Sequence, residues 1–417
     1  MEWWQQIRNK FINNRKVAEN YFFMTLLMSV SLLITLAIYP YLIRVLGKEV
    51  YGSYVFVFSV IQFFQVLVSF GFDIPAMKKI SLHKDDLLLK SRVLSEVIAA
   101  KLLIFVVCFL VLLSLIEVFD ILRYNKMLFI ILFFTQIAEL MPPTWYFQGV
   151  QKMRVVSITN LSIRLLAIPF IIILVSDESH LLRYALITSM SIVVAAIVSL
   201  FYLLMVEKVR FQIVGIGRLK SVFIEAVPFF WTSAFETLRR SYITVIVGYG
   251  LGMQSVAVYD LANKLVLTPR MLVAAINGAL FPNVIENHSW HRVKRIIRYE
   301  MLISLGISFL IIIFGYPMVI LLGGRELAEA YPVSIILSFY ILAFLMAECY
   351  TNFIFVPKGM YGVIGWNKLF ATMFAVVGIT ISSVWIQSLW LSVAVFSISF
   401  FVEVFLCRWR MKSCHLE

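Results

Sequence analysis

The sequence predicts an all-α integral membrane protein with twelve transmembrane helices, arranged as two six-helix lobes around a central cavity. Three observations support this fold class. The 417 residues are 62% hydrophobic and only 14% charged. Apolar runs of about 20 residues recur throughout the chain, and each can cross a hydrocarbon core of roughly 30 Å. One short motif also occurs once in each half of the chain, which indicates an internal repeat.

The twelve spans follow one another between short connections, so no large loop is left over for a soluble domain. They lie near 20–46, 51–75, 93–117, 127–150, 155–175, 181–205, 220–249, 256–281, 300–322, 330–356, 361–386 and 389–407. The predicted domains are an interfacial segment (1–19), an N-terminal lobe (20–210), a C-terminal lobe (211–407) and a tail (408–417).

The distribution of basic residues predicts the orientation. The net charge is +13, but the Lys and Arg residues gather in alternate connections, 23 on one side against 6 on the other. Cytoplasmic loops carry this excess in helical membrane proteins. We therefore expect both termini in the cytoplasm and no nucleic-acid partner.

The repeated motif supports two parallel halves. Leu46-Gly47 followed by Tyr54 recurs as Leu251-Gly252 followed by Tyr259, at an offset of 205 residues. Each copy lies in a predicted outer turn between two spans. Six spans in each half, starting from the same side, indicate repeats related about the membrane normal, as known in transporters. Coincidence is the alternative, because Leu, Gly and Tyr are common here.

Charged residues inside the predicted spans suggest a polar cavity. A charge at the bilayer centre costs about 3 kcal/mol, so these residues are expected to face the protein interior. The bases are Lys101, Arg164, Arg239, Arg240, Lys264, Arg270 and Lys368, and the acids include Asp73, Glu139, Glu236, Asp260 and Glu348. Arginine binds phosphate oxygens in a bidentate way, so adjacent Arg239 and Arg240 favour an anionic ligand such as a diphosphate.

Structural ion pairing is the alternative role for these charges. Asp260 and Lys264 stand four residues apart on one helical face, where a pair is expected. Pairing of Glu236 with Arg239 or Arg240 is equally open, as is a structural role for Glu139 and Glu348. No acid lies within a turn of Arg164. Lys101 and Lys368 lie close enough to the inner ends to snorkel to the interface.

Sequence signatures of energy-coupled enzymes are missing. The chain contains no phosphate-binding Walker loop, no HExxH motif and no histidine cluster, so we expect no ATP-driven chemistry, no metal and no cofactor.

Four stretches resemble the Wzx-type polysaccharide flippases, which belong to the multidrug/oligosaccharidyl-lipid/polysaccharide exporter superfamily. The stretches are YPYLIRVLGKEVYGSY (39–54), FGFDIPAMKKIS (70–81), PPTWYFQGVQKMRVVSI (142–158) and VGYGLGMQSVAVYDLANKLV (247–266). The resemblance implies a bacterial inner-membrane flippase for undecaprenyl-diphosphate-linked oligosaccharide repeat units of O-antigen or capsule. It also implies alternating access driven by a proton or sodium ion, with the pathway's polymerase and chain-length regulator as candidate partners.

The expected site residues follow from the charges and the resemblance together. Substrate binding is assigned to Arg44, Arg164, Arg239, Arg240, Lys264 and Arg270, and ion coupling to Asp260, Glu236, Glu348 and Glu139. A multidrug antiporter for organic cations is the alternative within the superfamily, but seven intramembrane bases argue against it. A polysaccharide polymerase or ligase would need a large outer loop, and the outer loops are short.

Overall fold

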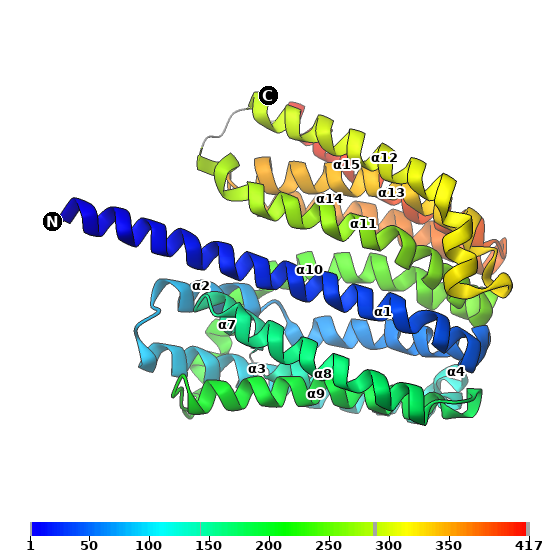
Figure 1. The fold of residues 1–417 in the computed structure, drawn as a ribbon, viewed down its shortest axis with the longest axis horizontal. Coiled ribbons are helices and arrows are strands. Elements are labelled where there is room, and N and C mark those ends of the chain that lie inside the picture. The colour runs from blue at the N-terminus through cyan, green and yellow to red at the C-terminus, as the bar shows by residue number, and fades with distance from the viewer. Residues whose placement is uncertain (1, 142, 287–289, 414–417) are drawn as a thin grey trace. The chain divides into compact units, whose positions relative to one another are not determined.

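A computed structural model describes residues 2–141, 143–286 and 290–413, and within these ranges the chain is helical with no β-strand (Figure 1). The first half contains α1 (Glu2–Ser69), α2 (Asp73–Leu82), α3 (Leu87–Val118), α4 (Asp120–Tyr124), α5 (Lys126–Phe133), α6 (Ile137–Leu140), α7 (Pro143–Gly149), α8 (Met153–Leu174) and α9 (Leu181–Met205). The second half contains α10 (Ile216–Leu251), α11 (Met253–Glu286), α12 (Trp290–Gly323), α13 (Ala330–Tyr350), α14 (Tyr361–Thr380) and α15 (Leu389–Ser413).

Nine helices of the described ranges are long and apolar enough to cross a membrane. The first of them, Phe22–Ser69, has 48 residues, about twice the length that one crossing needs. It breaks at Gly47, where the backbone is non-helical. Helices α10 and α11 have 36 and 34 residues, which is also long enough for one crossing, but they are not among these nine. The protein is therefore a multi-pass helical membrane protein.

Two predicted spans differ from the helices that form. The second span was expected to reach residue 75, but α1 ends at Ser69 because Phe70 and Gly71 have positive φ angles of 44° and 74°. A residue in the left-handed region ends an α-helix. The fourth span, 127–150, is divided into α5, α6 and α7. Met141 is extended there (φ −84°, ψ 147°), as expected for a residue that precedes proline.

The two copies of the repeated motif both form a turn. Gly47 and Gly252 have φ angles of 71° and 86°, which glycine adopts without the strain that a side chain would add. Glu49 accepts a hydrogen bond of 3.2 Å from the Gln254 amide, and these residues are also 205 positions apart. A Cβ atom on Gly52 would lie 1.9 Å from the Met253 carbonyl oxygen, so the two turns meet at a contact that requires glycine.

The helices form two compact units. Unit 1 comprises residues up to 35, 64–176 and 182–230, and unit 2 comprises 36–63, 177–181 and the chain from 231 onward. These limits assign the middle of α1 to unit 2 and the start of α10 to unit 1, so the predicted lobe boundaries of 20–210 and 211–407 stay a prediction. Each unit has its own apolar core.

The core of unit 1 lies between α2, α3 and α7. Trp145, Tyr146 and Phe147 of α7 are all buried there, beside Phe72 and Leu94. The Trp-Tyr-Phe block that stood out in the sequence is therefore part of a packed core. Burying an aromatic side chain removes 150–250 Å² from solvent, which makes this block a large stabilising contribution.

In unit 2, α13 is the central helix. It packs against α11, α12 and α15, and α14 packs against α15 (Figure 1). Most side chains of α13 are buried, including Leu337, Tyr340 and Ile341. A helix that is buried nearly all round must satisfy any polar group it carries inside the protein. This position makes the charges around α13 a candidate site.

Candidate functional site

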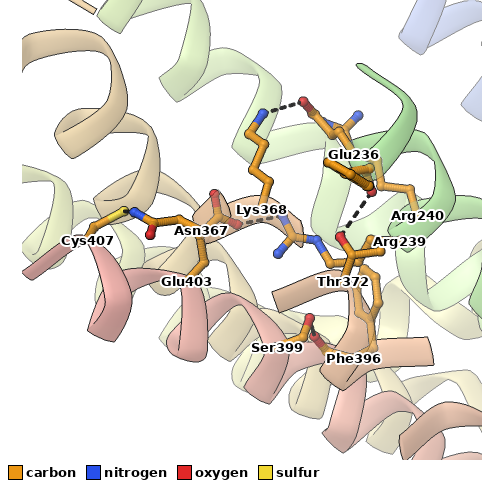
Figure 2. Close-up of polar contacts among 11 residues, drawn as sticks. Glu236, Arg239, Arg240, Asn367, Lys368, Thr372, Phe396, Ser399, Glu403 and Cys407 are labelled. Atoms are coloured by element: carbon orange, nitrogen blue, oxygen red, sulfur yellow. Dashed lines mark hydrogen bonds and ion pairs between the residues drawn. The ribbon is translucent and has the colours of Figure 1, made fainter. Parts of the chain in front are cut away.

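Arg239 on α10 lies at the centre of a charged cluster in unit 2. Only 3% of the residue is exposed. Its Nη2 atom lies 2.7 Å from Oε2 of Glu403 on α15, and the guanidinium carbon is 3.8 Å from the centroid of the Phe400 ring. Figure 2 shows this ion pair between the two helices. The pair accounts for one of the three guanidinium nitrogens.

Two nitrogens of Arg239 remain available. Among the described residues, Nε and Nη1 have no hydrogen-bond acceptor, although both are buried. Leaving a buried donor without a partner costs about 1–3 kcal/mol of stability. An acceptor supplied by a ligand would remove this cost. Arg239 therefore combines a structural pair with free donors.

Glu236, one turn before Arg240, is shared by two bases. Arg240 forms an ion pair with one carboxylate oxygen, and the Lys368 Nζ atom donates to the other at 3.1 Å (Figure 2). Successive residues on a helix point about 100° apart, so Arg239 and Arg240 face different neighbours. Of the two pairings left open by the sequence, the structure has Glu236 with Arg240. It also places Lys368 on Glu236, instead of at the membrane interface.

A cavity of about 220 Å³ lies at this cluster. Its lining consists of Glu236, Arg239, Phe344, Ala347, Glu348, Thr351, Asn352, Lys368 and Glu403. Oε2 of Glu348 is buried and has no hydrogen-bond donor within the described chain. Thr351 and Asn352 belong to a π-helical turn, Thr351–Phe355. Such turns occur frequently at functional sites, because the wider turn frees backbone groups.

Arg270 on α11 is a second buried arginine beside α13. It is 5% exposed, and its guanidinium carbon lies 4.2 Å from the centroid of Phe344 and 5.6 Å from that of Tyr340. Its Nε and Nη1 atoms also have no acceptor among the described residues. Stacking on aromatic rings holds the guanidinium in place without using its hydrogen-bond donors. Arg239 and Arg270 are thus both buried, both contact an aromatic ring, and both keep two nitrogens without an acceptor in the described part of the chain.

Lys264 and Asp260 form the ion pair that their spacing on α11 predicts. The Tyr51 hydroxyl donates to Asp260 Oδ2 at 3.1 Å, and Lys264 Nζ lies 3.0 Å from the same hydroxyl oxygen. Lys264 also lies 4.8 Å above the Tyr39 ring. Both charges are therefore neutralised locally, so a substrate role for Lys264 and a coupling role for Asp260 stay predictions.

A second charged cluster lies in unit 1. Lys101 Nζ is 2.7 Å from Asp73 Oδ1 and 4.0 Å from Glu139 Oε2, and the other Glu139 oxygen accepts a 2.6 Å hydrogen bond from Gln65. The Lys101 side chain is only 2% exposed, so it points into the protein and does not snorkel to the interface. Of the roles left open for Lys101, the structure has ion pairing and not snorkelling, because two carboxylates within the unit compensate its charge.

Two predicted substrate residues remain, Arg44 and Arg164. Arg44 on α1 is exposed and forms no ion pair within the described ranges, whereas Arg164 is half-buried on α8 of unit 1. Sequence reasoning also missed Glu403, the partner of Arg239. A carboxylate inside the last apolar run was the available signal. An intramembrane acid predicts a basic partner without identifying it.

Unit 2 also contains an apolar groove of about 440 Å³ along α11 and α12. It is lined by Leu36, by Leu265, Thr268 and Pro269 of α11, and by Ile307, Leu310, Ile311, Phe314, Gly315, Met318, Leu321 and Leu322 of α12. The Thr268 hydroxyl donates to the Lys264 carbonyl at 2.7 Å, which leaves its methyl group for the groove. Along the sequence of α11, charged residues and residues that line the groove therefore lie next to each other.

Comparison with known proteins agrees with this arrangement. The sequence model of the polysaccharide biosynthesis protein family matches residues 17–288 of this chain. A protein of Escherichia coli (strain K12) named "Putative O-antigen transporter" is 25% identical over 320 residues, which cover 76% of each chain. A protein of the same name from Shigella dysenteriae is 24% identical over 282 residues, covering 65% of this chain and 70% of the relative.

Two solved structures are similar in fold. An inward-facing multidrug resistance MATE family transporter of the MOP superfamily superposes with a TM-score of 0.69 at 14% identity, over 93% of this chain and 95% of that one. The lipid II flippase MurJ in an inward closed conformation superposes with a TM-score of 0.70 at 12% identity, over 93% and 87%. The resemblance to Wzx-type flippases that the sequence motifs indicated is thereby confirmed.

Proposed function

Because this chain belongs to the polysaccharide biosynthesis protein family, we propose that it is a flippase for lipid-linked polysaccharide precursors. Its substrate would be an undecaprenyl-diphosphate-linked oligosaccharide repeat unit of O-antigen or capsule, moved from the cytoplasmic to the outer leaflet. The similar proteins are named as transporters or as a flippase, which supports transport as the activity and argues against an enzyme.

The single observation that carries this proposal is that α11 contributes both charged residues and groove residues. Lys264 and Arg270 are its charged residues, while Leu265, Thr268 and Pro269 line the apolar groove. A lipid-linked diphosphate has the same division, with a doubly charged head and a long isoprenoid chain. The groove could hold part of that chain, because its apolar lining resembles the lipid tails that the isoprenoid would leave.

Buried arginines would bind the diphosphate. Arg239 and Arg270 each keep two donors without an acceptor, and an arginine fork binds phosphate oxygens in a bidentate way. Arg240 is the more exposed neighbour, and Arg44 and Arg164 are further candidates. Around α13 the bases Arg239, Arg240, Lys264, Arg270 and Lys368 are matched in number by the acids Glu236, Asp260, Glu300, Glu348 and Glu403. The arginine nitrogens that have no acceptor among the described residues favour an anion over the organic cations of a multidrug antiporter.

Twelve spans would result if α1 crosses the membrane twice and α10 and α11 cross it once each. Both termini would then lie in the cytoplasm, in agreement with the distribution of Lys and Arg. Two lobes would alternate their access between the faces of the inner membrane, driven by a proton or sodium ion. Among the proposed coupling acids, Asp260 and Glu236 are paired with bases, whereas Glu348 and Glu139 each keep an oxygen that no base contacts within 3.5 Å.

Complementation of a deletion strain tests the flippase assignment. We expect the strain to lose surface polysaccharide and to accumulate the lipid-linked repeat unit, and we expect Arg240→Ala to fail to restore transport. Arg123→Ala is the matched control, because Arg123 is an exposed arginine that pairs with Glu117 outside the site. Restoration by Arg240→Ala at normal protein levels would remove Arg240 from the substrate site. A deletion strain with normal surface polysaccharide and no trapped intermediate would contradict the function itself.

A further inference from the structure

The cavity beside Arg239 in unit 2 has one wall that the arginines do not form. Its lining residues on α13 and on the π-helical turn that follows are Phe344, Ala347, Glu348, Thr351 and Asn352. These positions have the spacing i, i+3, i+4, i+7 and i+8, which places side chains on one face of a helix. A single helix face therefore lines the cavity with an aromatic ring, a carboxylate, a hydroxyl and an amide.

The charges that line the cavity pair with one another, except that of Glu348. Arg239 lies 2.7 Å from Glu403, and Lys368 lies 3.1 Å from Glu236 (Figure 2). Glu348 forms no ion pair within the described ranges, and its buried Oε2 atom has no hydrogen-bond donor there. Leaving a buried acceptor without a donor costs about 1–3 kcal/mol of stability.

Arg239 lacks the opposite kind of partner in the same cavity. Its Nε and Nη1 atoms have no acceptor among the described residues. A phosphate oxygen would satisfy Arg239, but an ionised phosphate has no proton to donate to Glu348 and would be repelled by its charge. A hydroxyl group both donates and accepts hydrogen bonds. The two unsatisfied groups therefore fit a ligand in which a phosphate is bonded to a hydroxyl-bearing unit.

A sugar bonded to a phosphate has this composition. Glu348 and Asn352 would form hydrogen bonds with its hydroxyl groups, and the Phe344 ring would contact its apolar C–H face. The cavity has a volume of about 220 Å³. At roughly 30 Å³ for each water molecule, this volume corresponds to about seven waters, which is enough space for one sugar ring.

Phe344 connects this cavity with the other arginines of unit 2. The guanidinium carbons of Arg270 and Arg240 lie 4.2 Å and 5.8 Å from the centroid of the Phe344 ring. A diphosphate bound by these arginines would therefore lie next to a residue of the cavity lining. The sugar that is bonded directly to the diphosphate is the part of the substrate that would enter the cavity.

We propose that this cavity binds the first sugar of the lipid-linked repeat unit, with Glu348 accepting from one of its hydroxyl or acetamido groups and with Thr351 and Asn352 as further contacts. This inference rests on the proposed function, and it gives Glu348 a role in recognition that ion coupling does not require. It also restricts the substrate. Because the charge of Glu348 has no counter-charge in the lining, the first sugar is neutral, and a uronic acid at this position is rejected.

Calorimetric titration of the purified full-length protein with sugar 1-phosphates measures this selectivity without an ion gradient. We expect at least one of glucose, galactose and N-acetylglucosamine 1-phosphate to bind at least tenfold more tightly than inorganic phosphate. Glucuronic acid 1-phosphate should bind no more tightly than inorganic phosphate. Equal affinity for all of these probes would mean that water alone fills the cavity and would overturn the proposal, as would preferential binding of the glucuronic acid derivative.

Glu348→Gln provides the sharper test, because it removes the charge and keeps the size of the side chain. We expect the neutral sugar 1-phosphate to bind about fivefold more weakly, since a charged acceptor forms the stronger hydrogen bond. Glucuronic acid 1-phosphate should bind at least fivefold more tightly, since the repulsion is gone. Glu117→Gln is the control, an exposed acid of α3 in unit 1 that should change neither affinity.

The opposite directions of the two changes distinguish recognition from a structural role. A variant that merely folds less well would bind both probes more weakly, and this result, or no change in either affinity, would contradict the sugar site. The deletion strain tests the flippase assignment separately. If that strain traps the lipid-linked intermediate but the affinities do not divide in this way, the sugar site is wrong and the flippase assignment stands.

Discussion

The charged clusters of the two units leave different kinds of group without a partner. Around Arg239 in unit 2, arginine nitrogens have no acceptor among the described residues. Around Lys101 in unit 1, one base lies between two acids, and one carboxylate oxygen is 4.0 Å from the ammonium. Charges buried in membrane helices are therefore not equivalent. The group that is left without a partner, more than the presence of a charge, indicates what each cluster can bind.

The two clusters also differ in the type of base at their centre, an arginine in unit 2 and a lysine in unit 1. The planar guanidinium of Arg239 can pair with Glu403, stack on Phe400 and still offer two donors. Lys101 has a compact ammonium on a flexible stem, which can move between Asp73 and Glu139. The arginine can therefore pair within the protein and still offer donors to an anion, whereas the lysine compensates two nearby carboxylates.

Removing the arginine should have the largest effect. Arg239→Ala leaves the Glu403 side chain, which is 5% exposed, without its counter-charge. Breaking a buried ion pair in this way costs about 3–5 kcal/mol. We expect a strongly lowered thermal midpoint in detergent and little folded protein in the membrane.

The double variant Arg239→Met/Glu403→Leu separates stability from substrate binding. Replacing both partners by apolar residues of similar volume should restore most of the thermal stability. Transport should remain lost, because the donors of Arg239 are still missing. Full transport by this variant would assign Arg239 a structural role alone.

Removing the lysine should have an intermediate effect. Lys101→Met leaves Asp73 and Glu139 without a base, but their side chains are 37% and 26% exposed and are partly screened. We expect a loss of about 2 kcal/mol of stability, measured by thermal unfolding. Adding Asp73→Asn should recover part of the loss, and no recovery would argue against charge as its cause.

Neutralising Glu236 should give the Arg239 cluster of unit 2 one more uncompensated positive charge. Glu236→Gln releases Arg240 and Lys368 from their shared carboxylate. Inorganic pyrophosphate, used as a probe in a calorimetric titration, should then bind about tenfold more tightly, which corresponds to about 1.4 kcal/mol. Unchanged affinity, equal to that of the Glu117→Gln control, would mean that the released bases do not face the anion.

The smallest effect is expected where the charges already balance. Tyr51→Phe removes the hydroxyl that joins Asp260 and Lys264 but leaves their ion pair. We expect a loss of about 0.7 kcal/mol in stability and unchanged pyrophosphate affinity. A large change in affinity would instead place Lys264 in the substrate site.

Local features of the site could be predicted from the sequence. The pair of Asp260 with Lys264 and that of Glu236 with Arg240 follow from a spacing of four residues on a helix. Helix boundaries were mostly predicted as well, since apolar runs of spanning length define them. The fourth span, 127–150, was drawn as one run, although the sequence places Pro142-Pro143 within it and the helix breaks at Met141, directly before them.

Long-range partners could not be predicted. Arg239 and Glu403 come from α10 and α15, and nothing in the chain near either residue identifies the other. Lys101 obtains its partners from α2 and α6, which depends on how unit 1 packs. A single sequence contains the periodicity of each helix but not the rotation with which helices face each other.

The hydrogen bond between Glu49 and Gln254 has an implication for the history of the chain. In a symmetric homodimer, a residue next to the twofold axis meets its own copy on the other subunit. Glu49 and Gln254 occupy the same position of the two repeats, and Gly52 lies against Met253 beside them. Within this one chain, the contact therefore corresponds to the contact that a residue makes with its own copy in a homodimer. Such a contact is expected if the chain arose by duplication and fusion of a half-length ancestor that formed a dimer.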